Sequence, residues 1–456
     1  MTTTIPGPGL VGWEGEAGRS ISPPEKAMSI RRPHADISRR ALLRYLAASP
    51  LLSALGCAAP GPKKDTELVV DRFGTLGEPE QELGERVARA EDALDVFDLR
   101  VTAERRLPPA HYGYIATGVD GDETLRANRS VFDRWQIRSR RLAGLTDVDP
   151  STTVLGTAME TPIVVMPAGS QKAFHPDGEL ATARAARAEN HLMMLSTVTT
   201  TSVEAVTEAR GAPVWYQLYA TARWEITEKL LRRAEGAGCP VVVLTVDLPV
   251  ASNRASLQRF KKRDRRDCTQ CHAPGDGGPR TQYARKPMFD GLAMKDEYFD
   301  TPMQTWEFVE RLKAATPMKV VVKGIVTAED AERCIRHGAD GIVVSNHGGR
   351  AEESGRGALD SLPEIAGVVR KRIPVILDSG VRRGTDVFKA IALGADAVGI
   401  GRPYLWGLGA FGQAGVERVL GLLRAEVRTV MALAGTRSLA DVGSATVVRS
   451  GPQKSG

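Results

Sequence analysis

The chain has 456 residues, of which 42% are hydrophobic and 25% charged, as is ordinary for a globular protein with a substantial core. Its formal net charge is +6, but the excess is spread over a long chain and shows no basic stripe interleaved with aromatic residues. Nucleic acid is therefore not an expected partner. Five cysteines are too few for a disulfide scaffold, and Cys239 and Cys334, which flank predicted strands, are expected to be small buried residues.

Residues 1–60 are predicted to form a disordered N-terminus that ends in an export signal. The sequence SRRALLR at 38–44 precedes an apolar run at 45–56, which is too short to span a bilayer but suits the core of a signal peptide. This order resembles the bacterial twin-arginine signal, and the alternative is a surface helix that begins with two arginines. The expected partner is then the twin-arginine translocase, and the expected location is the periplasm. Because this route carries folded proteins, often with a cofactor, the leader also suggests a cofactor enzyme.

Two residues of this leader leave alternatives open. The sequence ALGC at 54–57 resembles a lipoprotein cleavage box, although these boxes usually carry Leu where Ala54 stands. Lipidation of Cys57 would anchor the protein to a membrane. Met28 is a candidate start that would leave a twin-arginine signal of ordinary length.

A linker and N-terminal helical segment are expected at 61–106, an α/β (β/α)8 TIM barrel at 107–442 and a C-terminal tail at 443–456. From residue 161 onward, eight short runs rich in Val and Ile alternate with segments of helical periodicity, which favours a closed barrel over an open sheet. The predicted strands are 162–166, 192–196, 214–218, 241–246, 319–322, 341–345, 375–378 and 397–401. Predicted helices between them include 179–190, 225–237, 328–337 and 384–393.

The loop after the fourth strand is unusually long, at about seventy residues where a βα connection with its helix needs far fewer. Its surplus, roughly 248–302, is expected to be an active-site lid, because loops after barrel strands lie at the catalytic face. Its centre, Cys268-Thr269-Gln270-Cys271-His272, matches the C-x-x-C-H signature of c-type haem attachment, and Met288 or Met294 would then be the second axial ligand. A disulfide or thiol pair and a Cys/Cys/His metal clip are the alternatives.

Polar side chains follow the predicted strands at their carboxyl ends, where they would form a ring around one ligand. They are Ser196, Gln217, Tyr219, Thr245, Asp247, Lys323, Ser345, Asn346, His347, Asp378 and Arg402. The sequences DSGVRRG at 378–384 and GIGR at 399–402 combine glycine and arginine after strands seven and eight. Barrels commonly bind phosphate at these two loops, where free backbone N–H groups and a helix N-terminus face the anion.

Three of these sequences, SNHGGR at 345–350, DSGVRRGTDVFK at 378–389 and GRP at 401–403, resemble one enzyme family. It is the FMN-dependent L-2-hydroxy-acid oxidase and dehydrogenase family, which includes glycolate oxidase, lactate oxidase and the flavocytochrome lactate dehydrogenases. The resemblance extends from residue 107 to residue 439. It implies FMN as cofactor and a small L-2-hydroxy acid as substrate. It also implies oxygen or a respiratory or haem acceptor for the electrons, and a homo-tetramer or homo-octamer.

The resemblance also implies roles for the residues that handle the substrate. Arg350 would clamp the carboxylate bidentately, with Arg254 as a second cation and Tyr114 adding a hydrogen bond. His347 would be the base for the hydroxyl or the α-proton, with Asp247 orienting its ring.

The resemblance implies one more role at the substrate and several at the cofactor. Tyr219 would hydrogen-bond the substrate oxygen. Lys323 would lie near the flavin N1–C2 carbonyl and favour the anionic reduced ring. The other residues implied in cofactor binding are Pro167, Ala168, Gly169, Ser196, Gln217, Thr245, Asp378, Gly380, Arg382, Gly401 and Arg402. No metal site is expected.

The chain departs from the family in two places. After Arg350 the family usually continues Gln-Leu-Asp, whereas this chain reads AEESGR at 351–356. Val198 and Ala251 stand where glycolate oxidase carries bulky residues, which implies a roomier pocket that would admit lactate or a larger hydroxy acid.

Two other functions are alternatives to oxidation. A type 2 isopentenyl diphosphate isomerase is another FMN barrel, but it has no use for a carboxylate clamp. A non-catalytic periplasmic flavin-binding protein would have no reason to keep a His–Asp pair.

Overall fold

The structure is a computed structural model that describes residues 84–266, 285–294 and 304–450. The predicted leader, with Arg39, Arg40 and Cys57, lies outside these residues, as does the motif Cys268, Cys271 and His272. Within the described ranges, none of the helices combines the length and apolarity that crossing a membrane requires. The His, Cys, Asp and Glu side chains of the same ranges form no group of three or more that could hold a metal ion.

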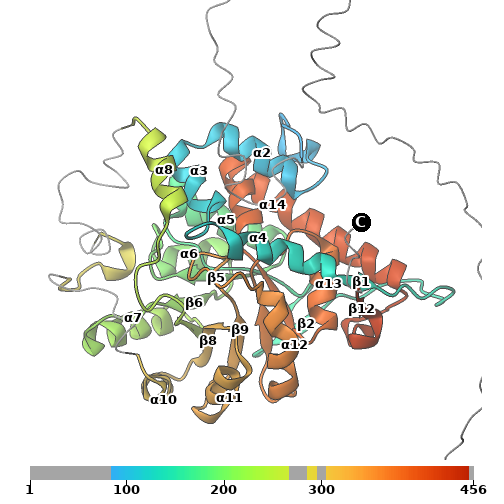
Figure 1. Ribbon diagram of the computed structural model, residues 1–456. Helices are drawn as coiled ribbons and strands as arrows, with labels where there is room; N and C mark the ends of the chain where they lie inside the picture. Colours follow the sequence, from blue (N-terminus) through green and yellow to red (C-terminus); the bar gives the residue numbers. More distant parts are fainter. Residues whose placement is uncertain (1–83, 267–284, 295–303, 451–456) are drawn as a thin grey trace, which may run out of the picture. The chain divides into compact units, whose positions relative to one another are not determined.

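Eight parallel strands close into a barrel, which confirms the predicted fold (Figure 1). They follow one another around the barrel in chain order, and β11 pairs with β4 to complete the circle. The strands are β4 (Ile163–Val165), β5 (Leu192–Ser196), β6 (Trp215–Leu218), β7 (Val241–Thr245), β8 (Lys319–Ile325), β9 (Gly341–Val344), β10 (Val375–Leu377) and β11 (Ala397–Ile400). Strand β8 extends beyond the predicted 319–322 and carries a register shift between Lys323 and Ile325.

A helix follows each barrel strand, and the helices surround the barrel (Figure 1). They are α5 (Gly178–Ala188), α6 (Val203–Arg210), α7 (Trp224–Gly236), α10 (Trp306–Ala315), α11 (Ala328–Arg336), α12 (Ala358–Val369), α13 (Gly384–Ala392) and α14 (Arg402–Ala434). The side chains of Ser202 and Thr327 cap the first turns of α6 and α11, as these residue types commonly do. Helix α14 is interrupted at Phe411 and Gly412, whose backbone is not helical.

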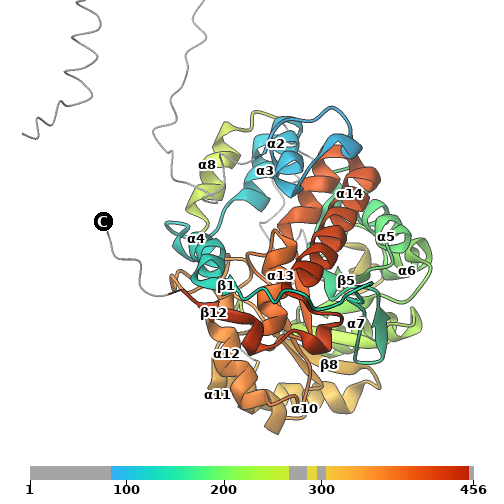
Figure 2. The same cartoon turned by 90° about the vertical axis from the view of Figure 1, so that its right-hand side faces the viewer.

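The N-terminal segment adds further elements outside the barrel. These are η1 (Ala90–Asp92), α2 (Val96–Arg106), α3 (Pro109–Ala116), α4 (Glu123–Ser130), η2 (Val131–Arg134), β1 (Trp135–Ile137), β2 (Thr152–Val154) and β3 (Thr157–Met159). Helix α2 packs on α14, and α3 packs on α8 (Ala255–Arg263), which lies in the long loop after β7 (Figure 2). Within the predicted tail, β12 (Val447–Arg449) pairs antiparallel with β1.

Alternation along the strands separates two apolar layers. In β7, Val241 and Val243 join a buried cluster with members from all eight strands, whereas Val242 and Leu244 join the cluster that faces the helices. The hairpin β2–β3 contributes Val154 and Met159 to the interior cluster. Because side chains alternate with period two, the last interior residue of each strand can be located by counting in twos from the first interior residue.

Candidate active site

The ring of polar residues forms the uppermost interior layer of the barrel. Ser196, Gln217, Thr245 and Lys323 each lie two positions after an interior residue, so the strand alternation points them inward. Gln217 accepts a hydrogen bond from Ser196 Oγ at 3.1 Å and donates one from Nε2 to Thr245 Oγ1 at 3.0 Å. Strand alternation therefore places these four side chains in one layer without any contribution from the loops.

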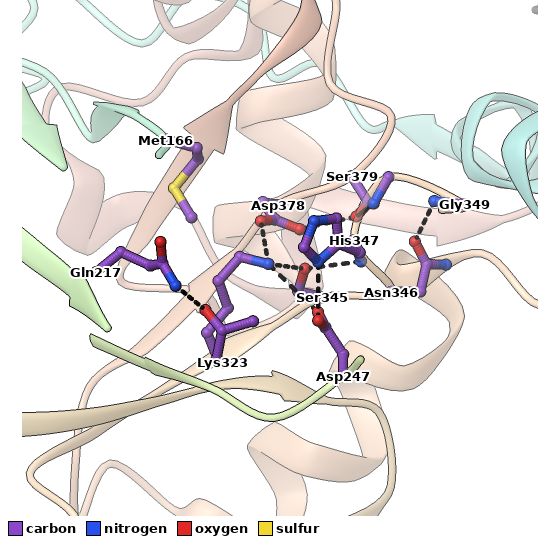
Figure 3. A network of polar contacts seen from close by, with 12 residues as sticks. Met166, Gln217, Asp247, Lys323, Ser345, Asn346, His347, Gly349, Asp378 and Ser379 are labelled. Carbon is purple, nitrogen blue, oxygen red and sulfur yellow. Dashed lines mark hydrogen bonds and ion pairs between the residues drawn. The ribbon is translucent and has the colours of Figure 1, made fainter. Parts of the chain in front are cut away.

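Asp247, Lys323 and His347 meet at the centre of this layer (Figure 3). The Nδ1 atom of His347 lies 2.8 Å from Asp247 Oδ1, and Lys323 Nζ lies 3.4 Å from Asp247 Oδ2. Lys323 also donates to Ser345 Oγ at 2.9 Å and lies 3.7 Å from Asp378 Oδ2. One buried ammonium thus links two carboxylates, one of which holds the histidine ring.

The charges of this cluster set its protonation. Burial raises the pKa of Asp247, but its electrostatic and hydrogen-bond contacts with His347 and Lys323 outweigh burial and bring it to about 2. Burial lowers the pKa of Lys323, and the two carboxylates reverse this and raise it above its ordinary value. Burial lowers the pKa of His347 more than Asp247 raises it. At neutral pH the cluster therefore holds an ionised aspartate, a charged lysine and a neutral histidine that can accept a proton.

Arg350 and Tyr114 form the second half of the site. The guanidinium carbon of Arg350 lies 4.1 Å from the centre of the Tyr114 ring, and Arg350 Nη2 is buried without a hydrogen-bond partner. The charge of Arg350 lowers the pKa of Tyr114 to about 8 against the effect of burial, and Arg254 adds to the shift. A buried guanidinium nitrogen that lacks an acceptor is costly, and a carboxylate is the group that matches its planar fork.

Burial raises the pKa of Tyr219 well above its ordinary value, and Asp247 adds to the shift. Its hydroxyl therefore stays protonated and can donate a hydrogen bond. Tyr219 lines the same pocket as His347 and Arg350.

The loops after β10 and β11 provide an open cradle. Gly401 caps α14 and lines the pocket, and a Cβ atom added to it would meet nothing within 4 Å. Arg382 also lines the pocket and lies over the Trp406 ring at 4.8 Å. A helix N-terminus, a glycine with open space beside its backbone and a guanidinium fit the phosphate and ribityl groups of FMN.

Arg402 is placed differently from a simple phosphate ligand. Its guanidinium donates to the backbone carbonyls of Ile115 at 2.5 Å, Thr117 at 3.1 Å and Gly348 at 2.9 Å. Although Arg402 lines the pocket, these bonds tie the segment that carries Tyr114 to the loop that carries His347.

Several residues at the site have strained backbones. His347, Ser379 and Ser170 have positive φ angles of 57°, 76° and 59°. Residues other than glycine rarely adopt this region, and such positions cluster at functional sites. Ser345 Oγ accepts from the backbone N–H of His347 at 3.1 Å, and Ser379 Oγ accepts from that of Gly348 at 3.0 Å, which helps to hold this turn.

The structure brings most of the predicted site residues into one pocket. These are Tyr114, Pro167, Ala168, Gly169, Ser196, Tyr219, Lys323, His347, Arg350, Asp378, Gly380, Arg382, Gly401 and Arg402. Gln217 and Asp247 are not in the pocket wall but bond Ser196 and His347, which form it. Thr245 accepts a hydrogen bond from Gln217. Arg254 acts on Tyr114 and Tyr219 through its charge.

Sequence reasoning missed the pocket residues Ile115, Met166 and Leu405. It gave no individual role to Ser379, Val381 and Gly399, which lie within the two predicted phosphate loops. Strand alternation could have identified Met166 and Gly399, which lie two positions after interior Val164 and Ala397. The reciprocal pair Asn128–Asn346, bonded twice at 2.9 Å, had no signal in the sequence.

Met288 and Met294, the predicted second axial ligands of a haem, both belong to the apolar core cluster. Cys239 and Cys334 are also buried and carry free thiols, as expected for small core residues.

The chain is similar to known proteins. The family described as FMN-dependent dehydrogenase matches residues 103–449. The chain is 39% identical to the L-lactate oxidase of Lysinibacillus sphaericus over 373 residues, covering 79% of this chain and 94% of that protein. It is 39% identical to glycolate oxidase 1 of Oryza sativa subsp. indica over 366 residues, covering 78% and 96%.

Solved structures are similar as well. A lactate oxidase structure from Pediococcus acidilactici superposes with a TM-score of 0.70 at 36% identity, over 81% of this chain and 97% of that one. A mandelate oxidase mutant crystallised with (S)-mandelic acid gives a TM-score of 0.68 at 37% identity, over 76% and 96%.

Proposed function

Since the chain belongs to the FMN-dependent dehydrogenase family and is an oxidoreductase of the 2-hydroxy-acid oxidase class, we propose that it oxidises a small L-2-hydroxy acid to the 2-oxo acid with His347 as base. The observation that carries this proposal is the buried Nη2 atom of Arg350, which lacks a partner in the same pocket as a neutral, Asp247-held histidine. A 2-hydroxy carboxylate supplies an anion for the first group and a proton for the second.

The described residues divide the work between them. Arg350 binds the carboxylate through parallel N–H···O bonds, and Tyr114 and Tyr219 donate hydrogen bonds to substrate oxygens. Asp247 holds His347 through Nδ1, which leaves Nε2 as the nitrogen that takes the proton. FMN, when bound, supplies the acceptor for the two electrons. Lys323, Asp378 and Arg382 line the pocket where the cofactor would be held.

The two other functions fit this site less well. An isomerase of a diphosphate would not need a guanidinium presented to a carboxylate beside a catalytic base. A protein that only binds flavin would not need the aspartate that orients His347.

We propose oxygen as the electron acceptor, because the similar proteins are named oxidases. The second candidate is a c-type haem on Cys268 and Cys271, which the C-x-x-C-H sequence supports and which lies outside the described residues. Peroxidase staining of denatured protein made with haem-attachment genes distinguishes them, because only a covalent haem gives a stained band that Cys271→Ser removes. A homo-tetramer or homo-octamer is part of the proposal, and sedimentation velocity measures it.

The test is anaerobic mixing of the FMN-loaded protein with L-lactate and L-mandelate. We expect the flavin absorbance to bleach with at least one of them. Arg350→Lys should raise the KM by about a hundredfold, because an ammonium cannot reproduce the planar fork. Arg356→Lys is the matched control in the same loop, since Arg356 is exposed and pairs with Glu364. Absence of bleaching across a panel of 2-hydroxy acids would contradict the proposal.

A further inference from the structure

A lysine from the long loop after β7 contacts Ser170, the residue that follows Gly169 in the pocket wall. Lys286 Nζ donates a hydrogen bond to Ser170 Oγ at 2.7 Å, and its side chain is half-buried. The neighbouring residues Met288 and Phe289 are buried, and the Pro287 carbonyl accepts a hydrogen bond from Arg233. The segment 285–294 is therefore packed against the barrel, and Lys286 has a defined position.

Ser170 connects this lysine to one wall of the pocket. The backbone N–H of Ser170 donates to the Val198 carbonyl at 3.0 Å. A Cβ atom added to Gly169 would lie 2.4 Å from Val198 Cγ2, so the Gly169 backbone packs closely against the Val198 side chain. Gly169 and Val198 both line the pocket. The ammonium of Lys286 is thus held on the side of the pocket that Val198 forms.

The charge of Lys286 reaches the substrate-binding groups. Arg350, Arg254 and Lys286 each lower the pKa of Tyr114, in that order of effect. The carboxylate of a 2-hydroxy acid would pair with Arg350. A second anionic group on the substrate would be attracted to the Lys286 ammonium, and the Val198 side chain is small enough to leave room for a longer tail on that side.

We propose that the substrate is a dicarboxylic L-2-hydroxy acid, with Lys286 binding its distal carboxylate and thereby determining specificity. This inference rests on the proposed oxidation of a 2-hydroxy acid by the same site. The 2-hydroxy carboxylate binds Arg350, the tail passes Val198, and the distal carboxylate accepts a hydrogen bond from the ammonium that Ser170 holds in place. The reaction at the 2-carbon is unchanged.

The experiment compares acids of equal chain length that differ in the distal group. The pairs are L-malate with L-2-hydroxybutyrate, and L-2-hydroxyglutarate with L-2-hydroxyvalerate. We expect the unmodified protein to prefer one of the dicarboxylic acids in kcat/KM. Lys286→Met should lower kcat/KM for that acid by about tenfold or more and change the monocarboxylic values by less than about threefold. Lys286→Arg should keep the preference, because it keeps the charge.

Lys172→Met is the matched control, since Lys172 is exposed two residues from Ser170 and its loss should leave both values unchanged. Binding of succinate and butyrate, measured by the change in flavin absorbance, tests the second anion site without turnover. A preference for monocarboxylic acids, or equal losses for both classes in Lys286→Met, would overturn the inference. If no 2-hydroxy acid bleaches the flavin while succinate still binds more tightly than butyrate in a Lys286-dependent way, the proposed oxidation fails and the second anion site stands.

Discussion

At His347, burial and neighbouring charges act on the imidazole in opposite directions. Burial lowers its pKa, the positive charges of Lys323 and Arg350 lower it further, and Asp247 raises it. The result is a ring that is neutral at pH 7 but has an ionised carboxylate at 2.8 Å to stabilise the cation that forms when it takes a proton. This combination is what a general base requires.

His347→Gln should preserve FMN binding and lower the rate of flavin reduction by at least about a hundredfold, because glutamine cannot accept the proton. Stopped-flow measurement of flavin bleaching under anaerobic conditions gives this rate. His337→Gln is the control, since His337 pairs with Glu310 at the outside of the barrel. A reduction rate within about tenfold of the unmodified protein would show that another group is the base.

Tyr114 makes substrate binding depend on pH. The charge of Arg350 lowers the Tyr114 pKa from its ordinary 10.0 to about 8. Below this pH the hydroxyl can donate to the substrate carboxylate, and above it the phenolate competes with the carboxylate for Arg350. We therefore expect KM to rise as the pH passes upward through 8. Measurement of KM from pH 6 to 10 should show this rise in the unmodified protein and not in Tyr114→Phe. If the rise in KM persists in Tyr114→Phe, a group other than Tyr114 causes it.

On the scale of elements, helix α4 is coupled to the loop that carries His347 and Arg350. Asp122 precedes this helix, but its carboxylate accepts hydrogen bonds from Gly118 N and Ser256 Oγ instead of capping it. Glu353 takes the capping role, because its carboxylate accepts from the backbone N–H groups of Gly121, Glu123 and Thr124. Glu353 stands where the family motif has Asp, so the changed sequence keeps a carboxylate at this position.

Glu353→Gln should lower the free energy of unfolding by about 1 kcal/mol, because a neutral amide is a weaker acceptor at a helix N-terminus. We also expect a higher KM, since α4 carries Asn128, which bonds Asn346 beside His347. Urea unfolding and steady-state kinetics measure the two effects. Glu352→Gln is the control, because Glu352 is exposed and its carboxylate accepts from Ser354. Equal effects of the two substitutions would contradict the assignment of Glu353 as the cap of α4.

On the scale of the whole molecule, the site is assembled from segments that are distant in the chain. Tyr114 comes from α3, Asp247 from the end of β7, and His347 and Arg350 from the loop after β9. Closure of the barrel brings the carboxyl ends of all eight strands together, which is why one pocket collects residues from positions 114 to 405.

The predicted leader gives a test for the complete chain. Replacing Arg39 and Arg40 with Lys should leave the protein in the cytoplasm of a bacterial host, still yellow and active, because the twin-arginine translocase reads this pair. Cell fractionation followed by flavin fluorescence locates the protein. Replacing Arg31 and Arg32, which precede the motif, should leave export unchanged. Normal periplasmic accumulation of the Arg39/Arg40 variant would contradict the twin-arginine assignment.

The sequence alone determined the fold and the inner layer of the site. The eight apolar runs identified the strands to within a few residues, and strand alternation then places Ser196, Gln217, Thr245 and Lys323 inside the barrel. These features are local, because each depends on the spacing of residues within one short segment. The motif SNHGGR at 345–350, which contains His347, could be recognised for the same reason, because its residues are consecutive in the chain.

Only the tertiary structure decided which groups meet across segments. Three examples are the contact of Lys286 with Ser170, the capping of α4 by Glu353 and the bonds of Arg402 to the carbonyls of Ile115 and Thr117. Each joins segments that are more than a hundred residues apart. Such contacts depend on strand register, barrel closure and the conformation of each loop, and no periodicity in the sequence encodes them. The charge around the substrate, and with it the inferred specificity, is therefore a property of the folded chain.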